Sequence, residues 1–248
     1  MANENGKVAG VYPEVGAGGF SRVDGTVDFY ARINALIRPE MRVLDLGAGR
    51  GAQLEKTDVP YRVNLQKLRG KVAELVGVDV DEAVLENRFM DKTVVVGLED
   101  SLPFADSSFD LVYADWVLEH VSEPDRFVRE VKRLLKPGGW FCARTPNYWG
   151  MTAVGARLVP ESAHAAVLKK LQPGRQERDI FPKVYKLNTQ RAVRQFFSRD
   201  EWDNFSYMHY AGPQYVEWSP ILMRVVNLAF RFLPGALYTN VHIFLRKK

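Results

Sequence analysis

A run of apolar residues that ends in three closely spaced glycines most constrains how this chain folds. Residues 43–51 read VLDLGAGRG, with Asp45 inside the apolar run and a glycine at every second position after it. An apolar run followed by glycines is typical of a buried strand that enters a tight turn before a helix. Glycines also let another molecule approach the backbone closely. We therefore expect a ligand at this turn.

Short apolar strands alternate with helical patterns on both sides of the turn. A helix is expected to begin at Pro124 and to end at Pro137-Gly138-Gly139, with its apolar residues on one face. Strands are expected at 41–46, 74–80, 93–97, 109–114, 140–144 and 202–211, with a terminal strand at 240–248. Alternation of this kind predicts an α/β fold in which crossover helices connect a parallel sheet.

The composition is that of an ordinary globular domain. The 248 residues are 46% hydrophobic and 26% charged, which suits one sizeable core. The single cysteine, Cys142, has no partner for a disulfide within the chain, so a reducing, cytoplasmic location is expected. The first residues show no signal-peptide pattern, and no apolar stretch reaches the length of a membrane span. We expect a soluble monomer or homodimer.

The net charge of +4 is unevenly distributed along the chain. Residues 1–150 carry a net charge of −4, and the remainder carries +8. A basic C-terminal part suits an anionic partner such as a nucleic acid, a lipid head group or a charged sugar. Lysines and arginines that only contact solvent are the alternative interpretation.

Asp45, just before the glycines, distinguishes between two kinds of nucleotide ligand. Gly47, Gly49 and Ala52 also fit the relaxed G-x-G-x-x-A pattern, which places a pyrophosphate at a helix N-terminus. Asp45 would repel a phosphate, whereas it would attract an ammonium group. A tight strand-to-helix turn without a ligand remains the other interpretation of these glycines.

A second acid ends the next expected strand. Asp79 has two carboxylate oxygens that suit the vicinal hydroxyls of a ribose, and Val80 would give a purine an apolar wall. Asp79 or Asp81 also suits the N-cap of the following helix. A nucleoside with an amino acid tail that satisfies both Asp45 and Asp79 is S-adenosylmethionine.

These motifs together resemble a known family. The segments VLDLGAGRG, GVDVD, LEDSLPFADSSFDLVYADWVLEHV and PDRFVREVKRLLKPGGW are similar to the class I S-adenosylmethionine-dependent methyltransferases. The resemblance covers residues 40–146 and is greatest for a broad bacterial group that includes quinone-biosynthesis and surface-sugar methyltransferases. It implies a doubly wound, Rossmann-like sheet of seven strands, mostly parallel with an antiparallel last strand, together with helical insertions.

The resemblance also implies which residues bind the cofactor. They are Asp45, Gly47, Ala48, Gly49, Asp79, Val80, Leu98, Glu99, Asp100, Asp115 and Trp116. The family usually has an acid directly after the third strand for the adenine amino group, and this chain has Leu98 there. The adjacent Glu99, or else Asp100, is the expected substitute, and exposed loop acids without a ligand are the alternative.

Methyl transfer mainly requires an acceptor that is aligned with the methyl group and shielded from water. A hydroxyl acceptor also needs a base, and His120 is the first candidate because it follows the loop after the fourth strand. Asp115, which lies in that loop, is a further candidate catalytic residue. His164 is the second candidate, whereas His242 in the terminal strand is expected to be structural. The histidines lack metal-ligand spacing, so no metal is expected.

The aromatic residues Trp116, Tyr148 and Trp149 are expected to stack on the acceptor or to face the sulfonium, with core packing as the alternative.

We expect a single domain with four parts: an N-terminal lid or helix at 1–39, a cofactor-binding core at 40–146, an acceptor-binding insertion at 147–188 and a C-terminal part at 189–248. The last part contains an amphipathic helix at 219–233. This helix is expected to pack against the domain, and weak contact with a membrane surface is the second hypothesis.

The sequence thus predicts S-adenosylmethionine-dependent transfer of a methyl group to a small or medium-sized acceptor, through a hydroxyl of a sugar or secondary metabolite. A lipid-linked or isoprenoid acceptor, an amino group, an RNA and a non-catalytic role as a partner subunit are the alternatives. Nucleic acid is not an expected partner, because Asp115-Trp116-Val117-Leu118 replaces the Asn/Asp-Pro-Pro-aromatic motif of many nucleic-acid methyltransferases.

Overall fold

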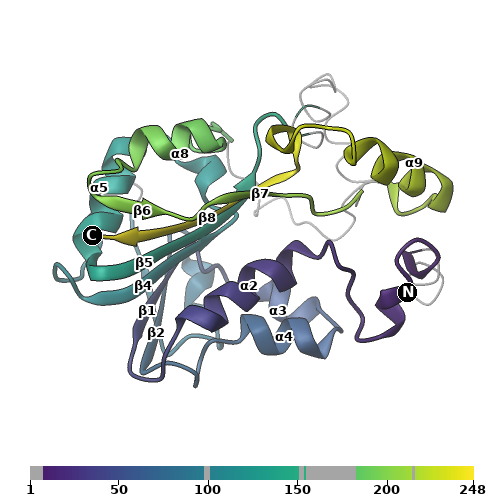
Figure 1. Ribbon diagram of the computed structural model, residues 1–248. Helices are drawn as coiled ribbons and strands as arrows, with labels where there is room; N and C mark the ends of the chain where they lie inside the picture. Colours follow the sequence, from purple (N-terminus) through teal and green to yellow (C-terminus); the bar gives the residue numbers. More distant parts are fainter. Residues whose placement is uncertain (1–7, 98–100, 151–153, 155–182, 214–215) are drawn as a thin grey trace.

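The protein is built around one twisted sheet that helices cover on both faces (Figure 1). The computed structural model describes residues 8–97, 101–150, 154, 183–213 and 216–248. Within these residues the sheet has eight strands in the order β3-β2-β1-β4-β5-β8-β6, and β7 also pairs with β8. The strands are β1 (Arg42–Leu46), β2 (Glu74–Asp79), β3 (Lys92–Val95), β4 (Phe109–Asp115), β5 (Leu135–Pro146), β6 (Trp202–Asn204), β7 (Tyr207–His209) and β8 (Asn240–Lys247).

The parallel strands bring distant residues to one edge of the sheet. β1 lies between β2 and β4, and Asp45 is in register with Gly77 on one side and with Tyr113 on the other. The chain therefore reverses its direction of winding next to β1, which is where doubly wound sheets bind ligands at the carboxyl ends of their strands. The predicted α/β fold is confirmed.

The antiparallel C-terminal half is also confirmed, with one correction. β8 runs antiparallel to β5, and both β6 and β7 pair with β8. The predicted strand 202–211 is interrupted, because the Asn204 side chain accepts a hydrogen bond from the Ser206 amide at 2.9 Å and turns the chain there. The interruption gives eight strands in place of the expected seven.

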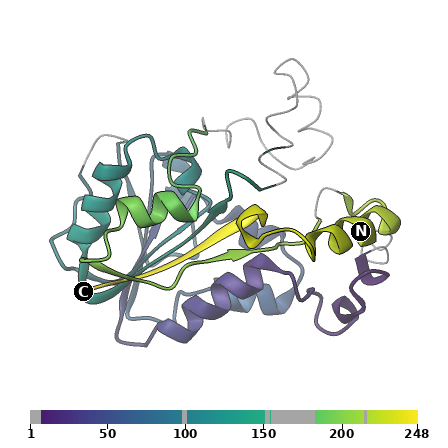
Figure 2. The same cartoon turned by 45° about the horizontal axis from the view of Figure 1, so that its top comes forward.

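Helices on the two faces bury two apolar clusters. One face carries α2 (Gly25–Leu36), α3 (Ala52–Lys56) and α4 (Pro60–Gln66), and the other carries α5 (Pro124–Leu134) and α8 (Gln190–Phe196) (Figures 1 and 2). Phe29 and Ile33 of α2 are fully buried in the first cluster, and Val131 and Leu134 of α5 are buried in the second. α5 ends at Leu134, before the predicted proline and glycines, because Leu135 already pairs with β4.

Short 3-10 helices punctuate the loops at η1 (Pro13–Gly16), η2 (Glu82–Glu86), η3 (Leu118–His120) and η6 (Gly235–Leu237). None of the helices in the described ranges has the combined length and hydropathy that a bilayer crossing requires. Most of the predicted insertion at 147–188 lies outside the described residues.

The N-terminal segment and a helix near the C-terminus pack together beyond the carboxyl ends of the parallel strands (Figure 1). α9 (Pro220–Phe230) begins at Ser219, whose side chain accepts a hydrogen bond from the Leu222 amide. Its Asn227 side-chain oxygen accepts hydrogen bonds from the hydroxyls of Tyr12 and Tyr210, each at 2.7 Å. The predicted amphipathic helix is therefore present and is tied to the start of the chain.

Candidate cofactor and acceptor site

The glycine turn lies at the carboxyl end of β1 and is fixed by the neighbouring strand. The amides of Gly47 and Ala48 both donate hydrogen bonds to the Val78 carbonyl, at 2.8 and 3.0 Å. Gly47 has φ +76°, and a Cβ there would lie 2.4 Å from Cγ2 of Val117, so only glycine fits. Gly49 has φ +48°, and a Cβ there would meet no heavy atom within 4 Å. The turn is thus packed at its first glycine and open at its second.

Asp79 connects the end of β2 to this turn. Its two carboxylate oxygens accept hydrogen bonds from the Gly49 amide at 2.8 Å and from the Asp81 amide at 3.0 Å. Asp81, in contrast, caps η2 by accepting a hydrogen bond from the Ala83 amide. The N-cap role considered for these acids is therefore that of Asp81, and each Asp79 oxygen keeps a lone pair. The adjacent Val80 is 36% exposed, as an apolar wall must be.

The buried side-chain amide of Asn87 holds the backbone of the glycine turn. The Asn87 side chain donates hydrogen bonds to the carbonyls of Ala48 at 3.0 Å and Gly49 at 2.9 Å, and it accepts one from the Phe89 amide. Because Asn87 is only 4% exposed, its side chain has little freedom to release these carbonyls. Asn87 therefore holds the backbone of the turn in one conformation.

Asp45 is a buried carboxyl group beneath the turn. It accepts a hydrogen bond from the Tyr113 hydroxyl at 2.7 Å. Burial raises the pKa of Asp45 well above its usual range, and the negative charges of Asp115 and Asp79 raise it further, although the Tyr113 hydrogen bond opposes the shift. Three carboxyl groups thus converge at this edge, where a cation would stabilise their ionised forms.

Replacing Asp45 by asparagine should change stability and ligand affinity in opposite directions. Asparagine still accepts the Tyr113 hydrogen bond but has no charge to bury, so the ligand-free protein should melt at a higher temperature at neutral pH. The folded wild-type protein holds the Asp45 proton more tightly than the unfolded chain, so its free energy of unfolding should fall as pH rises above the usual carboxyl range. That fall should be smaller in D45N.

The same substitution should weaken binding of S-adenosylhomocysteine about ten- to a hundredfold, because a hydrogen bond to a charged group contributes about 1.5–3 kcal/mol. Thermal denaturation between pH 4 and pH 8 and titration calorimetry measure the two effects. A D45N protein with unchanged affinity would remove Asp45 from the ligand site.

A buried ion pair fixes the end of β4. Arg144 on β5 is 3% exposed and forms a bidentate pair with Asp115, in which the second contact, from a terminal guanidinium nitrogen to Oδ2, is 2.9 Å. Asp115 also accepts a hydrogen bond from the Tyr30 hydroxyl at 3.0 Å, and Arg144 donates to the Thr26 hydroxyl at 2.9 Å. Both Asp115 oxygens are engaged, which favours a positioning role over proton transfer for this predicted catalytic residue.

The turn after β4 has an unusual backbone. Trp116 has φ +61°, a left-handed conformation that is rare for a bulky residue. Its amide donates to the Arg144 carbonyl at 3.1 Å, and the Arg144 guanidinium lies 5.1 Å from the centre of the indole ring. The ion pair therefore helps to hold Trp116 in a strained position beside the candidate site.

η3 leads from this turn to His120. Val117, which precedes η3, packs against Gly47, so this segment lies against the glycine turn. Glu119 points inward, is 4% exposed and accepts a hydrogen bond from Thr145, and burial raises the pKa of its carboxyl group. His120 is partly exposed, unlike its buried neighbour. The structure therefore leaves His120 as the accessible titratable residue of η3.

Aromatic residues follow β5 at the same end of the sheet. Tyr148 and Trp149 make an edge-to-face contact with ring centres 4.9 Å apart, and Trp149 is 57% exposed. The buried Asn147 side chain ties this segment to the carbonyls of Ala236 and Tyr238 at 2.8 Å each. Trp149 thus presents an aromatic surface to solvent, as expected of an acceptor contact.

Four predicted residues lie outside the described part of the chain: Leu98, Glu99, Asp100 and His164. The adenine contact and the second candidate base therefore stay predictions. Sequence reasoning missed other residues of this edge, namely Thr26, Tyr30, Asn87, Tyr113 and Arg144. Arg144 had a visible signal, because it is a charged residue at the end of the apolar run WFCAR.

The remaining histidines form a separate group. Potential ligand atoms of Asp28, His209 and His242 lie within 4.8 Å of one another, so the chemistry of a metal site is present. However, Asp28 already accepts hydrogen bonds from His242 at 2.9 Å and from Tyr207. Burial would raise the pKa of Asp28, but these hydrogen bonds outweigh it and lower the pKa to about 2, while burial lowers that of His242 to about 4. An ionised carboxylate bonded to a neutral imidazole accounts for this arrangement.

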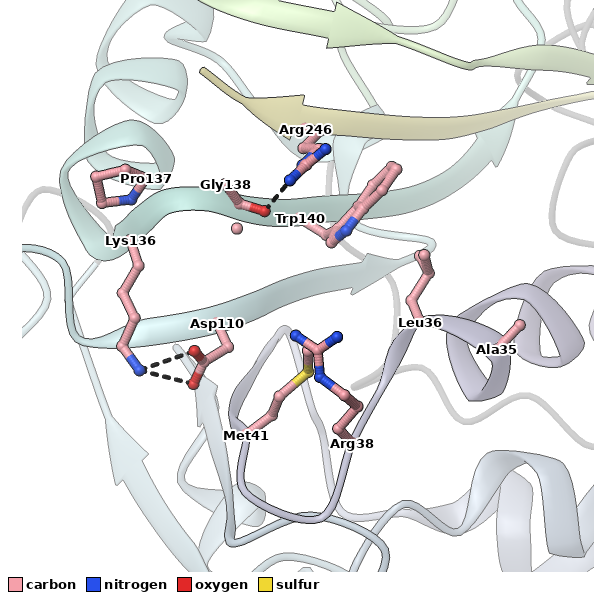
Figure 3. Close-up of a pocket in the computed structure, with 11 residues that line it drawn as sticks. Ala35, Leu36, Arg38, Met41, Asp110, Lys136, Pro137, Gly138, Trp140 and Arg246 are labelled. Atoms are coloured by element: carbon pink, nitrogen blue, oxygen red, sulfur yellow. Dashed lines mark hydrogen bonds and ion pairs between the residues drawn. The ribbon is translucent and has the colours of Figure 1, made fainter.

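A cavity of about 400 Å³ lies at the opposite edge of the sheet (Figure 3). Its lining includes Met41 before β1, Asp110 at the start of β4 and Trp140 on β5. Lys136 forms an ion pair with Asp110 in its wall, at 2.8 Å. Ligands of doubly wound sheets bind at the carboxyl ends of the strands, so the glycine turn is a better candidate site than this cavity.

Comparison with known proteins gives matches over the first five strands of the sheet. Residues 44–143 match the family described as a methyltransferase domain. A UbiE ubiquinone/menaquinone biosynthesis C-methyltransferase from Shewanella sp. strain W3-18-1 is 32% identical over 111 residues, which is 41% of either chain. The uncharacterized protein MJ1123 of Methanocaldococcus jannaschii is 29% identical over 47% of this chain and 51% of its own length. The chain thus matches about half or less of these curated relatives.

Solved structures agree with the fold. An S-adenosylmethionine-dependent methyltransferase from Mesorhizobium loti superposes with a TM-score of 0.52 at 17% identity, over 87% of this chain and 96% of that one. Another from Aquifex aeolicus gives 0.50 at 15% identity, over 98% and 97%. Residues 44–143 therefore match a methyltransferase domain, and the sheet has the fold of solved S-adenosylmethionine-dependent methyltransferases.

Proposed function

We propose that this protein transfers the methyl group of S-adenosylmethionine to a small or medium-sized acceptor at the carboxyl edge of the sheet. The observation that carries the proposal is the hydrogen bond from the Gly49 amide to Asp79, at a glycine whose own Cβ position is open. The turn would hold the methionine part near Asp45, and the remaining lone pairs of Asp79 would accept the ribose hydroxyls. The bound cofactor supplies an activated methyl group on a sulfonium.

The protein's own contribution is positioning. Methyl transfer is fast when the acceptor atom is held in line with the methyl group and water is excluded. The pair of Arg144 with Asp115 and the hydrogen bond from Tyr30 fix the turn that carries Trp116. Trp116 and the exposed Trp149 would then contact the acceptor from the ends of β4 and β5.

The acceptor atom in this proposal is a hydroxyl oxygen, in a sugar or a secondary metabolite. His120 supports this choice of acceptor, because its imidazole is partly exposed and it lies three residues after Val117, which packs against Gly47 of the glycine turn. The UbiE relatives are named for C-methylation in quinone biosynthesis, so carbon of an isoprenoid quinone ring is the second candidate. The two acceptors differ in their need for a base at the site.

Replacing His120 by alanine should lower kcat on a hydroxyl acceptor about a hundredfold or more, because general-base assistance typically contributes 10²–10⁴. The dissociation constant of S-adenosylhomocysteine should change less than about threefold. The measurement is transfer of labelled methyl from S-adenosylmethionine across a panel of hydroxyl acceptors. His120→Asn is the matched control, because it keeps a hydrogen-bonding group without the basic nitrogen and should be equally slow. A wild-type rate in either variant would remove His120 from catalysis.

A further inference from the structure

α9 has a second apolar face that points to solvent. Five large apolar side chains on and beside this helix are more than half exposed: Trp218 66%, Ile221 75%, Val225 57%, Leu228 55% and Phe232 81%. Ile221, Val225 and Leu228 follow one another at intervals of three or four residues, which places them on one side of α9. Trp218 precedes the helix and Phe232 follows it. We call these five residues the α9 stripe.

The opposite side of α9 already anchors the helix to the domain. Met223 and Phe230 are 0% and 3% exposed, and Phe230 stacks on Tyr210 with ring centres 4.3 Å apart. The hydrogen bonds from Tyr12 and Tyr210 to Asn227 add to this anchor. The α9 stripe is therefore not the face that attaches the helix to its own fold, and it needs another explanation.

The charge around the α9 stripe is positive. α9 contains no acidic residue, whereas Arg224 lies on it and Arg231 follows its last residue, both exposed and seven residues apart. That spacing places the two arginines on one side of the helix, bordering the stripe. Arg224 is held by the Gly10 carbonyl at 2.9 Å, and Glu217 is the acid next to the helix start. An anionic surface would complement this arrangement.

We propose that the α9 stripe binds the surface of an anionic lipid bilayer. An apolar stripe bordered by arginines, with a tryptophan at its end, matches helices that lie in the interface between head groups and acyl chains. Trp218 would place its amphipathic ring at the head-group level, while Arg224 and Arg231 contact lipid phosphates. α9 lies beyond the carboxyl ends of the parallel strands, next to the N-terminal segment (Figures 1 and 2). The bilayer would therefore meet the protein on the side of its candidate site.

Vesicle flotation with the full chain tests the proposal without any methyl acceptor. The wild-type protein should bind vesicles of phosphatidylcholine and phosphatidylglycerol (3:1) and should bind pure phosphatidylcholine at least fivefold less. Ile221→Ser combined with Phe232→Ser should lower binding to the mixed vesicles at least tenfold. Leu85→Ser and Phe205→Ser are matched controls, because these residues are 62% and 57% exposed and lie outside the α9 stripe, in η2 and between β6 and β7, and both should bind like the wild type.

Two further measurements separate the outcomes. All variants should keep the wild-type melting temperature within about 3 °C and the wild-type affinity for S-adenosylhomocysteine, which shows that they are folded. Absence of wild-type binding to both kinds of vesicle overturns the proposal. A dimer in light scattering that the two serine substitutions dissociate would assign the stripe to a second copy of the chain and would also overturn it.

Discussion

Asp79→Ala should weaken binding of S-adenosylhomocysteine at least about a hundredfold. Two hydrogen bonds from ribose hydroxyls to a carboxylate would be lost, each contributing about 1.5–3 kcal/mol. The Gly49 amide would also lose its 2.8 Å partner, which would loosen the turn proposed to hold the cofactor. Titration calorimetry on the purified protein measures the change.

Two matched variants separate ribose binding from support of the turn. Asp81→Ala removes the cap of η2 two residues away, and it should cost stability without changing affinity more than about threefold. Asp79→Asn keeps one acceptor oxygen and should give an intermediate affinity. Equal affinities for the wild type and Asp79→Ala would show that the end of β2 does not contact the cofactor.

Arg144→Gln should destabilise the fold by about 3–5 kcal/mol, the usual cost of removing one partner from a buried ion pair. Burial disfavours the charged guanidinium, but the Asp115 carboxylate outweighs it and raises the pKa of Arg144. Without Arg144, Asp115 would keep only the Tyr30 hydrogen bond in a largely buried position. Urea denaturation at pH 7 measures the loss.

The neighbouring strand offers a control for this substitution. Arg246 on β8 is exposed and contacts the Gly138 carbonyl at 3.3 Å, so Arg246→Gln should cost less than about 1 kcal/mol. Combining Asp115→Asn with Arg144→Gln should recover part of the stability, because no charge is then left buried. If Arg144→Gln costs no more than Arg246→Gln, the ion pair does not hold the end of β4.

The backbone of this protein follows from patterns that a single sequence displays. The apolar runs at 41–46 and 109–114 became β1 and β4 within one residue at either end, because buried parallel strands are continuously apolar. The glycine turn was predictable from the sequence because its geometry requires glycine: Gly47 has a positive φ, and a Cβ there would clash with Val117. Local composition was sufficient for both features.

Side-chain partners across the sheet were not predictable in the same way. Asp115 and Arg144 are far apart in sequence, and their pairing depends on the register between β4 and β5, which is shifted near Phe109. The break between β6 and β7 depends on the Asn204 side chain, which competes with the ladder for a backbone amide. Such contacts depend on tertiary geometry, and no periodic pattern encodes them.

The most direct test of the central claim is isothermal titration of the wild-type protein with S-adenosylhomocysteine, with NAD as a parallel ligand. A site made of Asp45, the open Gly49 and Asp79 predicts micromolar binding of S-adenosylhomocysteine and no detectable binding of NAD, whose pyrophosphate the carboxyl groups would repel. Failure to bind S-adenosylhomocysteine, or tighter binding of NAD, would contradict a methyltransferase cofactor site at this edge.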